Sequence, residues 1–227
     1  MSTWLYRIVL ALILAVVFYW LYPNAEANPR PEMWNLEQHN GQTSLLGLEI
    51  GKTSLHDAMQ TLKSVPDIAL FTKQRGRNEI EQDKHLEAFF DDLFDQGDSI
   101  ILGVGADESL LEHIKKDAYK PEIFPNGVIR VGVQESLYEH IETLPITNIT
   151  VLAGQQIDVE TFQKKFGKPE KLLNDGQGNA HFLYPKLGLD MIQPAGGEQI
   201  LQLVSPAMFD EKLRQPLLQS IANKSKG

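Results

Sequence analysis

Residues 149–170, ITVLAGQQIDVETFQKKFGKPE, contain a strand, a helix start and a helix stop in close succession, and this order sets the fold class. The apolar run 149–153 predicts a buried strand. Asp158 is the predicted N-cap of a helix with apolar residues on one face, and Gly167 followed by Pro169 predicts its end. A strand that leads into a short amphipathic helix is typical of an α+β protein.

Downstream of this helix the sequence predicts an antiparallel meander and a closing helix. Asn-Asp-Gly at 174–176 and Pro-Ala-Gly-Gly at 194–197 are turn signals. Pro206 opens the closing helix, and Pro216 is expected to kink or restart it. The four predicted strands are 171–174, 180–184, 189–193 and 199–204.

The first half of the chain shows a similar order of elements. After the apolar run 45–50, Ser54 is the predicted N-cap of a helix over 55–64. Asp107 or Ser109 caps a helix that closes this half. The other predicted elements are a strand at 68–73, a turn or loop at 75–78, strands at 85–94 and 99–106 joined as a hairpin, a loop around Pro121 and Pro125, a strand at 127–133 and a short helix at 136–143. A helix is the alternative for 85–94.

The sequence therefore predicts an α+β protein in which an N-terminal transmembrane helix precedes two similar lobes, each a helix plus an antiparallel sheet. The repeated order indicates either a duplication or an antiparallel α+β pattern without common ancestry. The predicted divisions are 1–22 as a membrane anchor or signal segment, 23–44 as a linker, 45–145 as the first lobe and 146–227 as the second lobe.

The stretch from Val159 to Pro206, which includes FGKPEKLLNDGQGNAHFLYPKLGLDMI and QILQLVSP, resembles the helix-then-meander module of the small outer-membrane assembly lipoproteins (the SmpA/OmlA-like family). In that module a helix that ends in a Gly-x-Pro turn leads into a three-stranded sheet. Tandem copies of the module would also resemble the β-lactamase inhibitor proteins. The chain departs from the lipoproteins because it has no cysteine to carry a lipid. The resemblance implies an envelope binding or assembly module, and no functional residue is carried over from it.

The N-terminal run 8–22, IVLALILAVVFYWLY, contains no charged residue. Extended to Trp4, it predicts a helix of about 28 Å, close to the thickness of about 30 Å of a bilayer core. Arg7 precedes the run, so the positive-inside rule keeps Met1 in the cytoplasm and exports the chain from Pro23 onward.

Two interpretations of this run share that orientation. Aromatic residues at both ends favour an uncleaved anchor, which predicts a single-pass inner-membrane protein with a cytoplasmic N-terminus and a periplasmic C-terminal domain. Ala25-Glu26-Ala27 is an A-x-A cleavage signal, which predicts instead a periplasmic or secreted protein that begins at Asn28. We favour the anchor.

Composition excludes several classes of site. The chain has no cysteine, so it has no disulfide, thiolate nucleophile, zinc finger or lipidated cysteine. Its net charge of −9 argues against binding to nucleic acid. Gly51-Lys52-Thr53 follows an apolar run, but Leu46 occupies the position where a phosphate loop has its first glycine, so no nucleotide is expected.

The side chains that could carry chemistry show no convincing pattern. The six histidines lack metal-ligand spacing, and each is expected to be a surface or half-buried residue. The acidic segment 79–98 contains Asp91, Asp92, Asp95 and Asp98, which could bind Ca²⁺ weakly. A solvated charged hairpin is favoured, because the spacing does not match an EF-hand loop.

The sequence thus predicts a non-catalytic, membrane-tethered, extracytoplasmic binding or scaffold protein of the cell envelope. We expect no catalytic, cofactor-binding or metal-binding residue, and neither a nucleotide nor a nucleic-acid ligand. The expected partners are an envelope protein and the membrane, the latter through the N-terminal helix. The alternatives are a cleaved, secreted inhibitor-type binding protein, and a hydrolase that uses the carboxylates of Asp91, Asp92 or Asp95.

Overall fold

A computed structural model describes residues 35–73, 82–93, 97–117, 119–125, 127–154 and 158–224. Within these ranges, no helix combines the length and the apolar character needed to cross a membrane. The predicted anchor 8–22, the proposed cleavage site after Ala27 and the predicted turn 75–78 lie outside the described residues. The described chain is a mixed α+β structure, as its sequence predicted.

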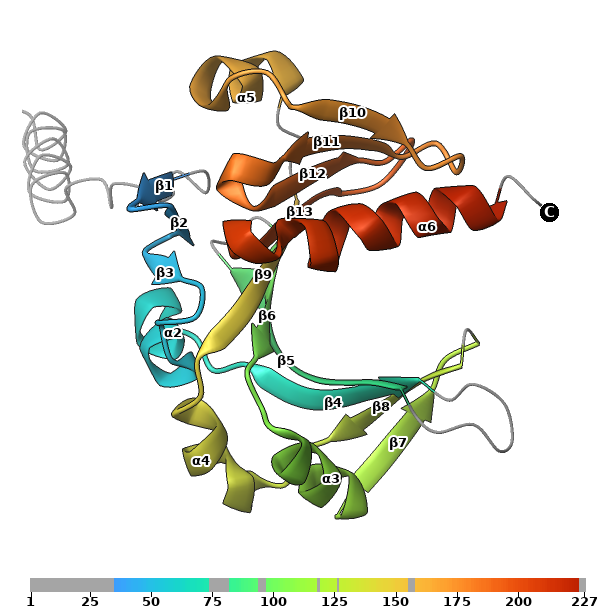
Figure 1. Ribbon diagram of the computed structural model, residues 1–227. Coiled ribbons are helices and arrows are strands. Elements are labelled where there is room, and N and C mark those ends of the chain that lie inside the picture. The colour runs from blue at the N-terminus through green and yellow to red at the C-terminus, as the bar shows by residue number, and fades with distance from the viewer. Residues whose placement is uncertain are drawn as a thin grey trace, which may run out of the picture. The chain divides into compact units, whose positions relative to one another are not determined.

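Ten strands form one antiparallel sheet in the order β10-β11-β12-β13-β9-β6-β5-β4-β8-β7 (Figure 1). Strands from both predicted lobes, 45–145 and 146–227, belong to this sheet, and β6 and β9 join the two sets. The strands are β4 (Asp67–Lys73), β5 (Gln82–Leu93), β6 (Asp98–Val104), β7 (Tyr119–Ile123), β8 (Val128–Gly132), β9 (Ile146–Ala153), β10 (Lys171–Asn174), β11 (Ala180–Tyr184), β12 (Leu189–Gln193) and β13 (Gln199–Val204).

Helix caps lie where the sequence predicted them. The side chains of Ser54, Asp107 and Asp158 each accept a hydrogen bond from the backbone N–H three residues later. The described helices are α2 (Leu55–Leu62), α3 (Glu108–Lys116), α4 (Tyr138–Glu142), α5 (Val159–Phe166) and α6 (Gln215–Lys224), with the short turns η1 (Glu135–Leu137), η2 (Pro185–Leu187), η3 (Pro206–Met208) and η4 (Asp210–Arg214). The π-helical turn η4 leads directly into α6 just before Pro216, so the helical geometry changes where a kink or restart was predicted, since proline supplies no N–H to the preceding turn.

Two parts of the chain differ from the prediction. The loop expected around Pro121 contains the strand β7, which tolerates a proline because it is an edge strand. Part of the predicted linker forms strands, and together with the following apolar run it makes a three-stranded sheet of β1 (Leu36–His39), β2 (Gln42–Leu45) and β3 (Leu48–Glu49). Asn40 and Gly41 join β1 to β2, and both residues have positive φ. These strands are short and mostly polar, so they lack the apolar alternation that identifies a strand.

Different helices cover the two faces of the ten-stranded sheet. The strand register places Val204 of β13 on one face and Lys84 of β5 on the other. Val204 packs with Phe209, which lies between η3 and η4. Lys84 instead forms an ion pair with Glu108 of α3. In Figure 1, α6 runs along β10–β13, and α3 lies on the other side of β4 and β5. Apart from the buried Ala69, the α6 face of β4, β5 and β8 carries half-buried and exposed side chains where the structure describes them.

Gly188, between η2 and β12, is held in a conformation that only glycine adopts easily. Its φ is +65°, and a Cβ at this position would lie 2.0 Å from the carbonyl oxygen of Val204. The N–H of Val204 donates to the carbonyl of Gly188, so the two backbones cannot separate without loss of this hydrogen bond. Gly196 provides a comparison, because a Cβ there would meet no atom within 4 Å.

We predict that Gly188→Ala lowers the free energy of unfolding by about 3 kcal/mol, through left-handed backbone strain and a backbone clash. Gly196→Ala should change it by less than about 1 kcal/mol, since the site is open. Urea denaturation of both variants, followed by far-UV circular dichroism, measures the difference. Equal stabilities would contradict the backbone geometry at Gly188.

Candidate functional site

A groove of about 870 Å³ lies where the two halves of the sheet meet. Its lining includes residues of the central strands β5, β6, β9 and β13. The groove is also lined by Gln42 of β2, the segment 50–52 before α2 and Leu111 of α3. The C-terminal helical segment (η3, η4 and α6) contributes residues of η3 and η4. We call this site the junction groove, because elements of both halves are needed to form it.

The lining of the junction groove combines apolar side chains with neutral hydrogen-bonding groups. The apolar residues include Leu86, Val104, Leu111, Val204, Met208 and Leu213. The neutral polar residues are Gln42, Thr147, Asn148, Thr150, Gln202 and Ser205. This mixture and this volume are typical of a site that binds a ligand by apolar contact and orients it through a few polar groups.

The positive charges of the groove are already matched by carboxylates. Three lysines belong to its lining, and each forms an ion pair. The pairs are Lys52 with Glu49 at 2.5 Å, Lys84 with Glu108 and Glu112, and Lys212 with Glu211 at 3.4 Å. Hydrogen bonds with the two glutamates raise the pKa of Lys84 above its ordinary value of 10.5, so this lysine is charged at neutral pH. The groove therefore favours a ligand recognised by shape and hydrogen bonds rather than by a net charge.

The position of Asn148 in the groove depends on a glycine in the neighbouring strand. Asn148 of β9 pairs with Gly103 of β6, and a Cβ at Gly103 would lie 1.8 Å from Asn148 Oδ1. The hydroxyl of Thr147 donates to the same oxygen at 3.2 Å. The amide of Asn148 thus lies in space that any larger residue at position 103 would occupy.

An aromatic surface extends from the groove along the α6 face of β5 and β4. His85 belongs to the groove lining and stacks on Phe71 with ring centroids 5.6 Å apart. Phe71 in turn contacts Phe89 at 5.6 Å. The guanidinium of Arg130 lies 6.0 Å from the Phe89 ring centroid and forms an ion pair with Asp67. Half-buried aromatic rings beside an arginine are enriched at protein interfaces.

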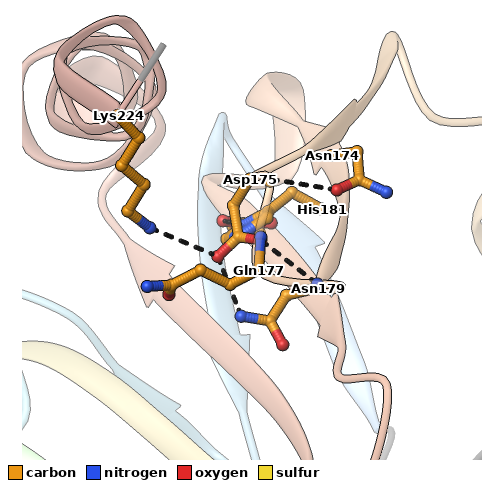
Figure 2. A network of polar contacts seen from close by, with 8 residues as sticks. Asn174, Asp175, Gln177, Asn179, His181 and Lys224 are labelled. Carbon is orange, nitrogen blue, oxygen red and sulfur yellow. Dashed lines mark hydrogen bonds and ion pairs between the residues drawn. The ribbon is translucent and has the colours of Figure 1, made fainter. Parts of the chain in front are cut away.

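A separate polar network lies at the β10–β11 turn, as Figure 2 shows. Asp175 accepts hydrogen bonds from the N–H of Gln177 at 2.7 Å, the N–H of Asn179 at 3.2 Å and the Asn179 side-chain amide at 2.8 Å. Lys224 of α6 approaches the same carboxylate at 3.9 Å. Burial opposes ionisation of Asp175, but these contacts outweigh it and hold its pKa below the ordinary value of 3.8.

Next to this turn, His181 and Asp190 form a buried pair. His181 Nδ1 lies 2.8 Å from Asp190 Oδ2, and both residues are buried. The expectation of a surface or half-buried histidine is therefore wrong for His181. Burial raises the pKa of Asp190 above 3.8, and the hydrogen bond with His181 only partly offsets this. Neither residue lines the junction groove, so we assign both polar centres to the stability of the second half.

The acidic residues singled out by the sequence are dispersed. The segment predicted as a strand with a helix as alternative is the strand β5, and Asp91 and Asp92 are exposed on it. Asp98 is buried, and its Oδ1 accepts the N–H of Gly154 at 2.8 Å, which ties β6 to the end of β9. Asp95 lies outside the described residues. Within the described ranges, no group of three metal-ligating side chains converges.

The junction groove is the described site whose chemistry best fits ligand binding, and its residues come from segments far apart in the sequence. No family model, curated protein or solved structure matches the chain. The interpretation of the groove therefore depends on its own geometry.

The two buried carboxylates of the second half should respond to pH in opposite ways. Asp175, with its lowered pKa, stabilises the fold above pH 3.8 and loses this contribution as the pH falls through its folded pKa. Asp175→Asn should therefore cost about 1–2 kcal/mol at pH 7 and progressively less below about pH 4.

Asp190, with its raised pKa, disfavours the fold once it ionises, and wild-type protein should gain stability from this group as the pH falls toward 3.8. Asp190→Asn should therefore become more favourable relative to wild type as the pH rises. Thermal unfolding of both variants from pH 3 to pH 7 checks this. The same trend in both variants would contradict the assignment.

Proposed function

We propose that this chain is a membrane-tethered, extracytoplasmic binding or scaffold protein of the cell envelope that acts without catalysis. The junction groove carries the proposal. It offers about 870 Å³ of space lined by apolar and neutral hydrogen-bonding groups, with its lysines matched by carboxylates. Such a surface suits an exposed segment of a partner protein, which presents apolar side chains and backbone N–H and C=O groups together.

The aromatic surface next to the groove supports a protein partner rather than a small solute. His85 joins it to the groove, and Phe71, Phe89 and Arg130 extend it over neighbouring strands. A partner that enters the groove could therefore also cover these rings. Aromatic and arginine side chains contribute a large share of the binding energy in many protein complexes.

The location in this proposal comes from the N-terminal sequence. The uncharged run 8–22 supports an inner-membrane anchor, and Arg7 supports an N-terminus in the cytoplasm. The folded domain would then lie in the periplasm. The resemblance of residues 159–206 to the small outer-membrane assembly lipoproteins agrees with an envelope role. In this proposal residues 45–145 and 146–227 are two similar lobes that share one sheet.

A second candidate function is a cleaved, secreted inhibitor-type binding protein. The A-x-A signal Ala25-Glu26-Ala27 favours it, because cleavage there would release the domain from the membrane. The groove would serve this protein equally well, so the two candidates differ in location and not in the binding site.

Cell fractionation with intact-mass measurement separates the two candidates. We expect a species that begins at Met1 in the inner-membrane fraction. A species that begins at Asn28 in the soluble fraction would overturn the anchor and favour the secreted protein. Substitution of the cleavage signal, Ala27→Leu, should leave the start at Met1 unchanged if the anchor is uncleaved, so that the mass rises only by the difference between the two side chains.

Site-specific photocross-linking in cells tests the groove itself. A photoreactive amino acid at Met208, which lines the groove, should capture a discrete envelope protein. The same amino acid at Val65, which is 77% exposed outside the groove, should not. Thr150→Arg would project a long side chain into the groove and should reduce capture at Met208 about tenfold or more.

Val65→Arg is the matched control for Thr150→Arg, since it adds the same side chain at an exposed site that does not line the groove. It should leave capture at Met208 unchanged. Thermal unfolding shows whether both variants are folded. Equal capture from Met208 and Val65, or capture from Met208 that Thr150→Arg does not change, would contradict binding in the groove.

A further inference from the structure

The two edges of the ten-stranded sheet differ in how they are protected. The edge strand β7 contains Pro121, which has no N–H, and its pairing with β8 shifts register between Tyr119 and Glu122. Both features obstruct the addition of another strand. The opposite edge strand, β10, contains no proline and pairs with β11 in unbroken register from Lys171 to Asn174. Strand β10 therefore lacks both of the protective features that β7 has.

The side chains of β10 are open to solvent. Leu172 is 59% exposed, and Lys171 and Asn174 are also exposed. Among the described residues, β10 has one ladder partner, β11. A regular edge strand that exposes a leucine is a template for an incoming extended segment, because its outward backbone groups can continue the ladder.

Three exposed lysines lie in α5, in the turn before β10 and at the start of β10. Lys164 and Lys168 lie at the end of α5 and in the following turn, and Lys171 begins β10; all three are exposed. Lys168 and Lys171 form no ion pair with any residue that the structure describes. The neighbouring carboxylate of Glu170 is bound by Arg214 at 2.8 Å. These exposed lysines belong to a chain whose net charge is −9.

The charges select between two kinds of incoming strand. A second copy of the chain, paired through its own β10, would add a second set of lysines along the same edge, and like charges repel one another. An acidic segment would instead place carboxylates beside Lys171 and an apolar side chain beside Leu172, because side chains alternate between the faces of a strand.

We propose that the edge of β10 binds an extended, acidic segment of a partner protein by strand addition. The segment alternates acidic and apolar residues, with the apolar side chains on the face of Leu172 and the acidic side chains on the face of Lys171. This inference does not depend on the junction groove, from which β10 is separated by β11 and β12.

A labelled peptide of alternating glutamate and valine or leucine, EVELEVE, tests the proposal against the full-length protein in a non-ionic detergent. Fluorescence anisotropy should show saturable binding that weakens about tenfold or more between about 50 mM and about 500 mM salt, since exposed charges are screened. The lysine counterpart, KVKLKVK, should bind at least about tenfold more weakly. Hydrogen exchange at residues 171–174 should slow when the acidic peptide is bound.

Two variants remove the proposed contacts. Leu172→Asp and the triple variant Lys164→Glu, Lys168→Glu, Lys171→Glu should each weaken peptide binding about tenfold or more. Their matched controls are Ile123→Asp, at a residue 73% exposed on the opposite edge, and Lys73→Glu, Lys116→Glu, Lys186→Glu, at exposed lysines elsewhere. The controls should bind like wild type.

Five outcomes would overturn the proposal. The acidic peptide could fail to bind, or bind no better than the basic one. The edge variants and their controls could lose affinity equally. Hydrogen exchange could slow at residues that line the junction groove and not at residues 171–174. Light scattering could show a dimer that Leu172→Asp dissociates, which would assign the edge to a second copy. The groove variant Thr150→Arg should bind the peptide normally, so failure here leaves the cross-linking test of the groove unaffected.

Discussion

The antiparallel pairing of β6 with β9 is the contact on which the rest of the described structure depends. It is the point in the sheet where strands of the first half meet strands of the second half. Ile100 and Leu102 of β6 face Val151 and Ile149 of β9, and all four are buried. Asp98 adds a hydrogen bond to the N–H of Gly154 beyond the last strand pair. Backbone pairing, apolar burial and a buried carboxylate thus stabilise the same junction.

The two faces of this junction differ in side-chain size, and small and polar side chains of one face contribute to the groove. On one face the central strands carry large apolar side chains. On the other face the neighbouring positions are Gly103, Asn148, Thr150 and Gln202. Gly103 contributes no side chain, and Asn148 occupies the space above it. Asn148, Thr150 and Gln202 line the groove together with residues of the opposite face such as Lys84 and Leu86.

Much of the fold follows from local sequence signals. The strands β10 to β13 have the same bounds as the four strands predicted, because turn residues fix both ends of each strand. Helices α2, α3 and α5 begin after predicted caps. The edge strand β7 was missed because Pro121 signals a loop, and proline is excluded only where an N–H must join the ladder.

The sites were harder to predict, because they depend on register between distant segments. His181 and Asp190 meet only once β11 and β12 pair, and no spacing rule for metal or catalysis identifies such a pair. The groove requires β6, β9 and β13 side by side in a particular register. The polar residues of β9 and β13 can be read from the sequence, but the sequence does not show which of them become neighbours.

The two surfaces proposed here differ in charge, and this gives them different physical behaviour. The groove matches its lysines with carboxylates, so its affinity should depend weakly on ionic strength. The edge of β10 leaves Lys168 and Lys171 without ion pairs among the described residues, so its affinity should depend strongly on ionic strength. Strands β10 and β13 are separated by three strand spacings, roughly 14 Å. A single partner could therefore reach both surfaces, with its acidic strand as the salt-sensitive part and its groove segment as the part retained at high salt.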